Sequence, residues 1–248
     1  MERRLPRSSI RVLDWGRRDY ASAFAAQREL QAAVIAGTAP DTLVLVEHDP
    51  VLTVTPRAAA AGHVLLSPRR LEAMGIAVHE TDRGGDVTYH GPGQLVAYPI
   101  LRLSNFGLNL SRHMRLLERV AIDTAAAFGV EARRDPPHTG VWVDAPVVAD
   151  GIANDDATPS VPAKLCAMGV RIRRNVTMHG LAFNGSPDLS HFATIVPCGL
   201  ADRAVTSLEA LLGDDCPALS EIGAVLTDAF DAAISRDDAA AVVRAAHE

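Results

Sequence analysis

The chain has 248 residues, of which 48% are hydrophobic and 22% charged, and its formal net charge is −6. These values are typical of a globular protein with a sizeable core. The acidic balance argues against a nucleic-acid-binding protein, which usually carries a basic stripe or patch. Three cysteines are too few for a disulfide framework, so we expect reduced thiols and a cytoplasmic location. We find neither a signal peptide nor an apolar run long enough to span a membrane.

The first half of the chain predicts one helix and several strands. Apolar residues spaced three or four apart predict a helix over 19–36, which Gly37 ends. Short runs rich in β-branched residues predict strands over 42–46, 51–55, 76–80 and 94–101.

The second half of the chain predicts further helices and strands. Both halves together predict a single domain. A helix is expected over 110–128 because Leu110, Met114, Leu117, Ala121, Ala125 and Phe128 recur at helical spacing. Strands are expected over 140–143, 169–173 and 181–183, and 206–209 has the capping-box pattern of a helix start. Residues 145–162 are rich in Asp, Ala and Pro, so we expect an exposed insertion, and 236–248 are expected to fray. Because strands and helices do not alternate regularly, we predict one α+β domain over 1–248 with its core over about 10–235.

The segment from Arg83 to Gln94 is unusually rich in glycine. Four glycines and one proline cost backbone entropy, so something must require that shape. One interpretation is a tight connection between two strands, and the other is a backbone wall against which a ligand packs. The segment matches neither a phosphate-binding loop with Gly-Lys-Ser/Thr nor a dinucleotide-binding Gly-x-Gly-x-x-Gly.

The candidate nucleophile is Cys198, which lies between Pro197 and Gly199 and is therefore expected at a sharp turn. Cys166 lies in an apolar run and is expected to be a buried structural thiol. Cys216 follows two aspartates, which would raise its thiol pKa and make it less reactive.

Lys164 is the only lysine of the chain, although arginine is abundant. Retention of one lysine favours a role for an ammonium group that can lose its proton, and the alternative is chance in an arginine-rich composition. The nine histidines form no zinc-binding spacing with one another or with cysteine, so we expect no metal.

Several blocks together resemble the lipoyl(octanoyl) transferases, which are octanoyl-carrier-protein:protein octanoyltransferases of lipoate biosynthesis. The most specific block is Arg83-Gly-Gly-Asp-Val-Thr-Tyr-His-Gly-Pro-Gly-Gln-Leu-Val-Ala-Tyr98. The others, in order, are Glu47-His-Asp-Pro-Val51, Lys164-Leu-Cys-Ala-Met-Gly169, His179-Gly-Leu-Ala-Phe-Asn184 and Ile195-Val-Pro-Cys-Gly199. The resemblance covers residues 44–208. It implies an α+β fold shared with biotin and lipoate protein ligases, with one larger and one smaller mixed β-sheet flanked by helices.

The resemblance also implies a mechanism. The family's acyl-thioester cysteine falls on Cys198 and its partner lysine on Lys164, so octanoyl would pass from acyl carrier protein through Cys198 to the lysine amine of a lipoyl domain. The accepting domains would be those of 2-oxoacid dehydrogenase complexes and the glycine-cleavage H protein, and neither ATP nor a metal cofactor would be needed. The implied substrate-binding residues are Arg83, Gly84, Gly85, Asp86, Val87, Thr88, Tyr89 and His90, then Ala167, Met168 and Gly169, then Gly180, Leu181 and Ala182. His48 and Tyr98 are expected to support the site. His90 and Tyr98 would hold its mouth, or else be satisfied polar groups of the core.

Two segments depart from the family pattern, and two rival functions stay open. Residues 145–162 are longer than the family's usual link before the lysine. Residues 53–57 read Thr-Val-Thr-Pro-Arg where the family usually has a glycine, which changes the turn there. The nearest rival is an ATP-dependent lipoate or biotin protein ligase, which would not need Cys198. A rival of another class is an inactive acyl-binding or carrier-docking module.

Overall fold

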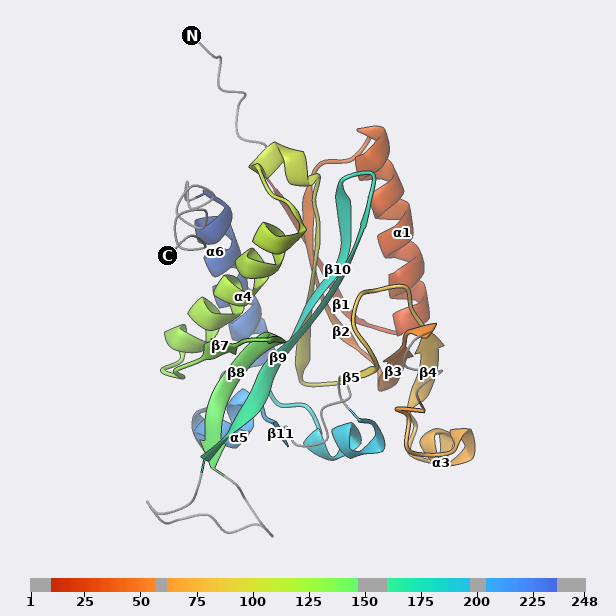
Figure 1. Cartoon of the computed structure of the whole chain (residues 1–248), viewed down its shortest axis with the longest axis vertical. Helices are drawn as coiled ribbons and strands as arrows, with labels where there is room; N and C mark the ends of the chain where they lie inside the picture. The colour runs from red at the N-terminus through yellow and green to blue at the C-terminus, as the bar shows by residue number, and fades with distance from the viewer. Residues whose placement is uncertain (1–9, 57–61, 147–159, 197–203, 236–248) are drawn as a thin grey trace.

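The computed structural model describes residues 10–56, 62–146, 160–196 and 204–235. These residues form two mixed β-sheets with helices packed against them (Figure 1). The larger sheet has the order β1-β2-β6-β10-β9-β8-β7, with β11 beside β9, and the smaller has the order β4-β3-β5. The predicted α+β class is therefore confirmed.

The strands of the larger sheet are mostly antiparallel, with parallel pairs at β1–β2 and β9–β11. In the smaller sheet β3 runs parallel to β4 and antiparallel to β5. The bounds of the strands are β1 (Arg11–Arg18), β2 (Thr42–His48), β3 (Val51–Val54), β4 (Ala77–Glu80), β5 (Thr88–His90), β6 (Gln94–Ile100), β7 (Arg133–Asp135), β8 (His138–Pro146), β9 (Ser160–Arg173), β10 (Val176–Asn184) and β11 (Ala204–Val205).

Helices cover both faces of the larger sheet. On one face α1 (Tyr20–Ala36) packs against β6 and β10, while α4 (Leu110–Ala127) and α6 (Leu219–Ser235) pack together on the other (Figure 1). Strand β10 lies between these layers, and all nine of its residues are buried. The short helices are α3 (Pro68–Ala73) and α5 (Leu208–Leu212), and 3₁₀ turns lie at Leu103–Phe106, Leu189–Thr194 and Gly213–Asp215.

The apolar core has three parts because the two sheets present three buried faces. The largest lies between the larger sheet and the α4–α6 pair and includes Leu117, Ala121, Phe183 and Leu226. A second lies under α1, and a third belongs to the smaller sheet. Burial at about 25 cal/mol per Å² of apolar surface stabilises these layers.

The helix ends follow from local capping groups. The Asp19 side chain accepts a hydrogen bond from Ser22 N at the start of α1, and Gly37 ends the helix with φ 76°, as its position predicts. The predicted capping box at 206–209 was wrong by one residue. Ser207, rather than Thr206, caps α5, and its side chain accepts from Ala210 N.

The sequence missed β1, β5, β7 and β11, which are short or exposed and have no clear alternation. The expected insertion over 145–162 is narrower than predicted, because Ala145 pairs with Val161 as β8 and β9 extend into it. The remainder of that insertion and the tail over 236–248 lie outside the described residues.

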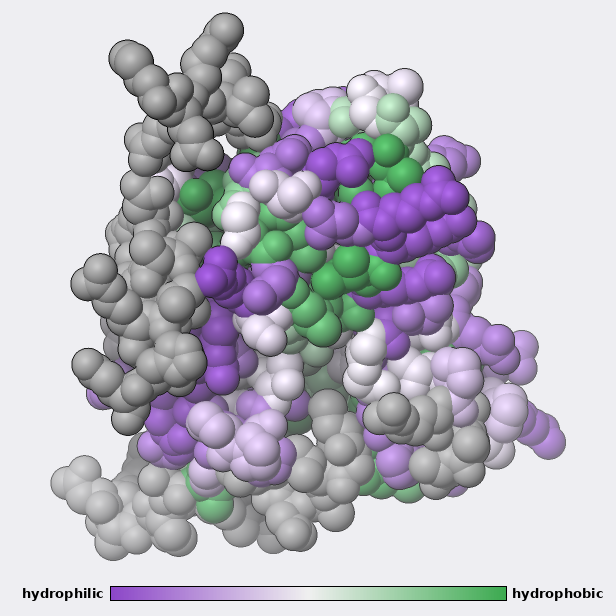
Figure 2. Space-filling model, turned by 45° about the horizontal axis from the view of Figure 1, so that its top comes forward, coloured by the Kyte–Doolittle hydropathy of each residue, from purple (hydrophilic) through white to green (hydrophobic). Residues whose placement is uncertain are grey.

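The described surface is mixed in character. Figure 2 shows apolar patches bounded by hydrophilic side chains on the face that it draws. Among the described residues, no helix combines the length and the hydropathy that crossing a membrane would require.

Candidate functional site

A cavity of about 630 Å³ lies where the glycine-rich segment meets β9 and β10. Most residues that the sequence assigned to substrate binding line it: Arg83, Gly84, Gly85, Asp86, Val87, Thr88, His90, Ala167, Met168, Gly169, Gly180, Leu181 and Ala182. Lys164 and Tyr98 line it as well. Residues from three parts of the chain, 83–98, 164–169 and 180–182, therefore meet at one site.

The glycine-rich segment lies directly on β9. Gly84 N donates to Val170 O at 2.9 Å, and a Cβ atom at Gly169 would lie 2.6 Å from Gly84 O. A Cβ atom at Gly180 would similarly lie 2.2 Å from Ala97 O. Glycine at 169 and 180 is thus required by close backbone approach, which supports the interpretation of this segment as a wall.

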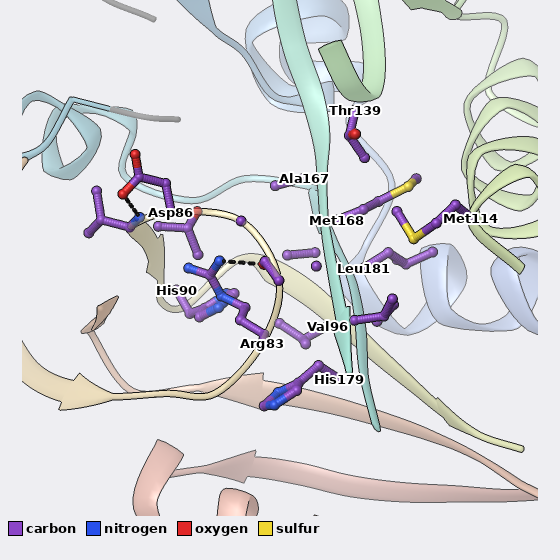
Figure 3. Close-up of a pocket in the computed structure, with 18 of the residues that line it drawn as sticks. Arg83, Asp86, His90, Val96, Met114, Thr139, Ala167, Met168, His179 and Leu181 are labelled. Carbon is purple, nitrogen blue, oxygen red and sulfur yellow. Dashed lines mark hydrogen bonds between the residues drawn. The ribbon is translucent and has the colours of Figure 1, made fainter. Parts of the chain in front are cut away.

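Arg83 fixes the beginning of this wall. Its guanidinium donates to the backbone and the hydroxyl oxygen of Thr53, each at 3.1 Å, and to Gly84 O (Figure 3). The Thr55 hydroxyl donates to Gly85 O at 3.3 Å. Thr55, which lies in the segment 53–57 that departs from the family pattern, thus contacts the glycine-rich wall.

Tyr89 does not line the cavity, although its two neighbours in β5 do. Successive side chains of a strand point to opposite faces, so Thr88 and His90 face the cavity and Tyr89 faces the core of the smaller sheet. There its hydroxyl lies 2.8 Å from His191 Nδ1 and its ring packs on Phe192. We therefore assign Tyr89 a structural position.

The Lys164 side chain extends from β9 to the cavity and is closely surrounded along its length. The residue is 8% exposed, and its Nζ atom lies 4.6 Å from the centroid of the Trp142 ring. A Cβ atom at Gly140 would lie 3.5 Å from Lys164 Cε. The aliphatic stem is thus enclosed, and the ammonium is held at a defined place in the wall.

Cys198 lies outside the described residues, so its distance from Lys164 stays a prediction. The described chain reaches Val196, whose N donates to His63 O at 2.9 Å. After the gap it resumes at β11, where Val205 pairs with Lys164. Both described ends that flank Cys198 are therefore anchored to residues that line the cavity or adjoin it.

The other two cysteines are placed as the sequence predicts. Cys166 is fully buried, and burial raises the pKa of its thiol far above the ordinary value. The pKa of Cys216 is also raised, first by burial and then by Glu209. The direction matches the prediction, whereas the charged neighbour is Glu209 rather than the two preceding aspartates.

One part of the cavity wall is apolar. Met114, Met168, Val96 and Leu181 gather on one side, opposite Arg83, His90 and Asp86 (Figure 3). Leu110 also lines the cavity and is 52% exposed. This first residue of the apolar repeat over 110–128 therefore faces the cavity rather than the core. The wall can bind an apolar tail next to polar groups.

The polar part of the wall holds an imidazole that is neutral. Burial and the nearby His48 lower the pKa of His90 to about 3. His90 Nδ1 donates to Gln94 Oε1 at 2.7 Å, and Gln94 is oriented by donating to Asn184 Oδ1. Because Nδ1 carries the single proton of the neutral ring, the Nε2 atom of His90 is unprotonated.

His48 supports the cavity from behind through Tyr98. Its Nδ1 donates to Arg18 O at 3.0 Å, so its Nε2 accepts a hydrogen bond of 2.7 Å from the Tyr98 hydroxyl. Burial lowers the pKa of His48 and raises that of Tyr98, so the pair is uncharged. Only Tyr98 of the pair lines the cavity.

The sequence missed several residues of the wall: Tyr20, His63, Val96, Leu110, Met114, His138, Thr139, Val170 and His179. Val96 and His179 lie within the recognised blocks 83–98 and 179–184, and Val170 directly follows the block 164–169. Buried His179, with φ 61°, lies 2.9 Å from Asp82 Oδ1 through its Nε2. Among the described residues no group of His, Cys, Asp and Glu could hold a metal ion.

Comparisons with known proteins agree with this architecture. Residues 19–231 match the model of the lipoyl protein ligase A/B catalytic domain. The octanoyltransferase of Geobacter metallireducens is 44% identical over 206 residues, which are 83% of this chain and 85% of that protein.

Solved structures show the same fold at low identity. The crystal structure of lipoate-protein ligase A bound with ATP has a TM-score of 0.64 at 14% identity, covering 91% of this chain and 85% of that one. The biotin protein ligase of Aquifex aeolicus in complex with biotin and ATP has a TM-score of 0.51 at 10% identity, covering 91% and 71%. The fold predicted from the sequence is confirmed, and the chain belongs to the lipoyl protein ligase A/B catalytic domain family, among its octanoyltransferases.

Proposed function

We propose that this protein transfers octanoyl from the phosphopantetheine thioester of acyl carrier protein to Cys198, and then to the lysine amine of a lipoyl domain. The acceptors are the lipoyl domains of 2-oxoacid dehydrogenase complexes and the glycine-cleavage H protein, and these partners place the enzyme in the cytoplasm. The observation that carries the proposal is that the only lysine of the chain is buried in the wall of a partly apolar cavity.

Chain geometry supports a meeting of Cys198 with this cavity. Cys198 follows Val196 by two positions, and Val196 N donates a hydrogen bond to His63 O in the cavity wall. Two extended residues span at most about 7 Å. We therefore infer that Cys198 acts at the His63 end of the cavity.

Electrostatics explain why a lysine is useful there. A free thiol with a pKa near 8.5 is only about 3% ionised at neutral pH. An ammonium group within about 4 Å favours the thiolate, and lowering the pKa by ~1.5 units makes it half ionised. Lys164 is the residue of the cavity wall that would supply this ammonium group.

The reaction proceeds in two half-reactions of ping-pong order. The Cys198 thiolate attacks the carrier thioester, the carbon–sulfur bond of the carrier breaks, and the carrier thiolate takes a proton from Lys164. In the second half-reaction an amine attacks the Cys198 thioester, an amide forms and the Cys198 thiolate leaves. Neutral Lys164 takes the proton that the amine nitrogen loses and so returns to its ammonium form. Neither half-reaction consumes ATP, because thioester exchange is nearly balanced and amide formation from a thioester runs downhill.

The cavity wall supplies the remaining requirements. Strand β8 pairs with β9 only as far as Cys166, so Ala167 to Gly169 have no β8 partner, and backbone N–H groups there would bind the developing oxyanion. The apolar side would bind the acyl tail at about 0.8 kcal/mol per buried methylene group, enough to select chain length.

The proposal is tested with purified octanoyl-carrier protein and a lipoyl domain in buffer without ATP. Octanoylation of the lipoyl-domain lysine is expected, and a strict requirement for ATP would instead favour a ligase. Lys164→Arg keeps the charge and cannot readily shuttle a proton, so transfer should fall by about 10²-fold or more. Octanoyl transfer at the wild-type rate by Lys164→Arg would contradict the role of Lys164 in moving the proton.

A ligase is the second candidate because the fold neighbour, lipoate-protein ligase A, binds ATP in its crystal structure. That likeness is 14% identical and shows the fold alone. An inactive acyl-binding module would bind the carrier protein without transferring its acyl group. The assay without ATP separates these alternatives.

A further inference from the structure

A histidine and an aspartate that the reaction so far leaves unused face the same cavity. His63 Nδ1 lies 2.6 Å from Asp86 Oδ2, and both residues line the cavity. Their side chains are 25% and 13% exposed, so the pair is partly shielded from solvent. The other Asp86 oxygen accepts from Val87 N at 2.9 Å, which fixes the carboxylate.

This pairing selects one tautomer of the imidazole. A carboxylate only accepts hydrogen bonds, so His63 Nδ1 carries a proton and donates it to Asp86. In neutral His63 the Nε2 atom is then the free base. Ser-His-Asp sites use the same arrangement, in which the carboxylate orients the ring and stabilises the imidazolium that forms.

His63 also adjoins the chain that leads to Cys198. Val196 N donates to His63 O, Leu65 N donates to Thr194 O at 2.8 Å, and Val64 forms a bridge with Ile195. Residues 63–65 and 194–196 therefore run antiparallel in contact. The imidazole enters the cavity beside the last described residues before Cys198.

The proposed second half-reaction needs a base at this place. A lysine side chain has a pKa near 10.4, so the incoming amine arrives as an ammonium ion and must lose a proton before it attacks. Lys164 can accept that proton only when it is itself neutral, which is the state left after the carrier thiolate is protonated. The incoming ammonium loses two protons in all as it becomes an amide nitrogen, and neutral Lys164 can accept only one of them, so a second base is needed for the other.

We propose that His63 is a second proton-transfer residue and that Asp86 positions it. The inference rests on the proposed function. His63 Nε2 takes a proton from the lipoyl-domain ammonium, and the amine lone pair then forms the C–N bond. The C–S bond breaks to give the Cys198 thiolate, and a second proton leaves the nitrogen to restore neutral Lys164 to its ammonium form. The imidazolium, paired with Asp86, returns its proton to solvent.

The other histidines of the cavity fit this role less well. His90 donates through Nδ1 within a buried network, and His179 has its Nε2 on Asp82. His138 forms a longer pair of 3.3 Å with Asp135, which is not part of the cavity wall. Among the cavity histidines that the structure describes, only His63 both forms a short contact with a carboxylate and lies beside the residues that precede Cys198.

The test separates the two half-reactions in the full-length protein. The wild type, His63→Ala and Asp86→Asn are each loaded with octanoyl from carrier protein, desalted, and mixed with either a lipoyl domain or hydroxylamine. Hydroxylamine is uncharged at neutral pH and needs no base to become nucleophilic. His191→Gln is the matched control, because His191 contacts Asp188 outside the cavity.

His63→Ala is expected to load octanoyl within about threefold of the wild-type rate and to lose about 10²-fold in transfer to the lipoyl domain. Cleavage by hydroxylamine should stay within about threefold, and added imidazole should restore part of the lysine transfer. Asp86→Asn should show the same pattern with a smaller loss, and the double variant should lose no more than His63→Ala.

Lysine transfer at the wild-type rate by His63→Ala would overturn the inference. Equal losses in loading and in hydroxylamine cleavage would also overturn it, because they indicate that His63 only shapes the backbone near Cys198. A selective loss in His138→Ala instead of His63→Ala would move the role to His138. Failure of the wild type to form a thioester would reject the proposed function itself.

Discussion

The Nζ atom of Lys164 lies 4.6 Å from the centroid of the Trp142 ring, across the register pair that joins β9 to β8. The aromatic face attracts the ammonium electrostatically and limits where the side chain can move. Because Lys164 is also only 8% exposed, little space is left in which its side chain could move. Its placement therefore depends on a residue that the sequence did not single out.

Trp142→Leu is expected to slow acylation of the protein by carrier-bound octanoyl by about tenfold, since a cation–π contact contributes about 1–2 kcal/mol. Trp142→Phe keeps an aromatic face and should stay within about threefold. Rates come from intact mass against time, with Tm recorded because Trp142 is fully buried. Wild-type acylation by a folded Trp142→Leu protein would show that the ring does not position Lys164.

Tyr89 and Tyr98 provide a matched pair of hydroxyl deletions. Tyr89→Phe removes a contact with His191 in the core and should cost about 1 kcal/mol of unfolding free energy, with transfer unchanged within about twofold. Tyr98→Phe leaves His48 Nε2 without its partner in the cavity wall and should lower kcat/KM as well. Denaturant unfolding and transfer kinetics check both, and the reverse ranking of the two activities would contradict our placement of Tyr89.

Gly169→Ala is expected to destabilise the fold by about 1–3 kcal/mol and to displace the glycine-rich wall, because the new Cβ would lie 2.6 Å from Gly84 O. Gly223→Ala in α6 is the control, since its Cβ would meet only ordinary contacts, the nearest 3.5 Å away. Urea unfolding and the KM for octanoyl-carrier protein measure the two effects. Equal behaviour of both variants would mean that the wall tolerates a side chain at 169.

His113 is expected to make stability depend on pH. It is fully buried, neither ring nitrogen has a hydrogen-bond partner among the described residues, and burial lowers its pKa to about 4 from the ordinary 6.5. The unfolded chain binds the proton more readily, so this contribution is complete above pH 6.5 and is lost as the pH falls toward 4.

His113→Phe should therefore gain stability relative to the wild type on acidification, by on the order of 3 kcal/mol between pH 7 and pH 4. Denaturant midpoints at both pH values give this difference directly, and His191→Gln serves as a control at a partly exposed histidine. A difference between wild type and His113→Phe that is independent of pH would reject the assignment.

Elements with strong local signals were predictable from the sequence. Asp19 and Gly37 mark the ends of α1, and the apolar repeat over 110–128 marks α4. The motif blocks also located most of the cavity wall, because close backbone approach at Gly169 and Gly180 requires glycine. These features depend on neighbours in sequence or on a single residue type.

Other features depend on contacts between distant segments and left no local pattern. Helical periodicity cannot distinguish a core face from a cavity face, so the repeat that contains Leu110 did not indicate that this residue lines the cavity. Tyr89 was grouped with its neighbours because β5, a strand of three residues, was not predicted. The pairing of His63 with Asp86 arises only when the glycine-rich wall folds onto the segment that holds His63.

The central claim is that Cys198 carries the acyl group while Lys164 keeps the sulfur ionised, and intact mass after incubation with octanoyl-carrier protein tests it most directly. The wild type is expected to gain one octanoyl mass that hydroxylamine removes, and Cys198→Ala is expected to gain none, whereas Cys166→Ala should load normally. An octanoyl adduct that persists in Cys198→Ala, or its absence from the wild type, would contradict the account.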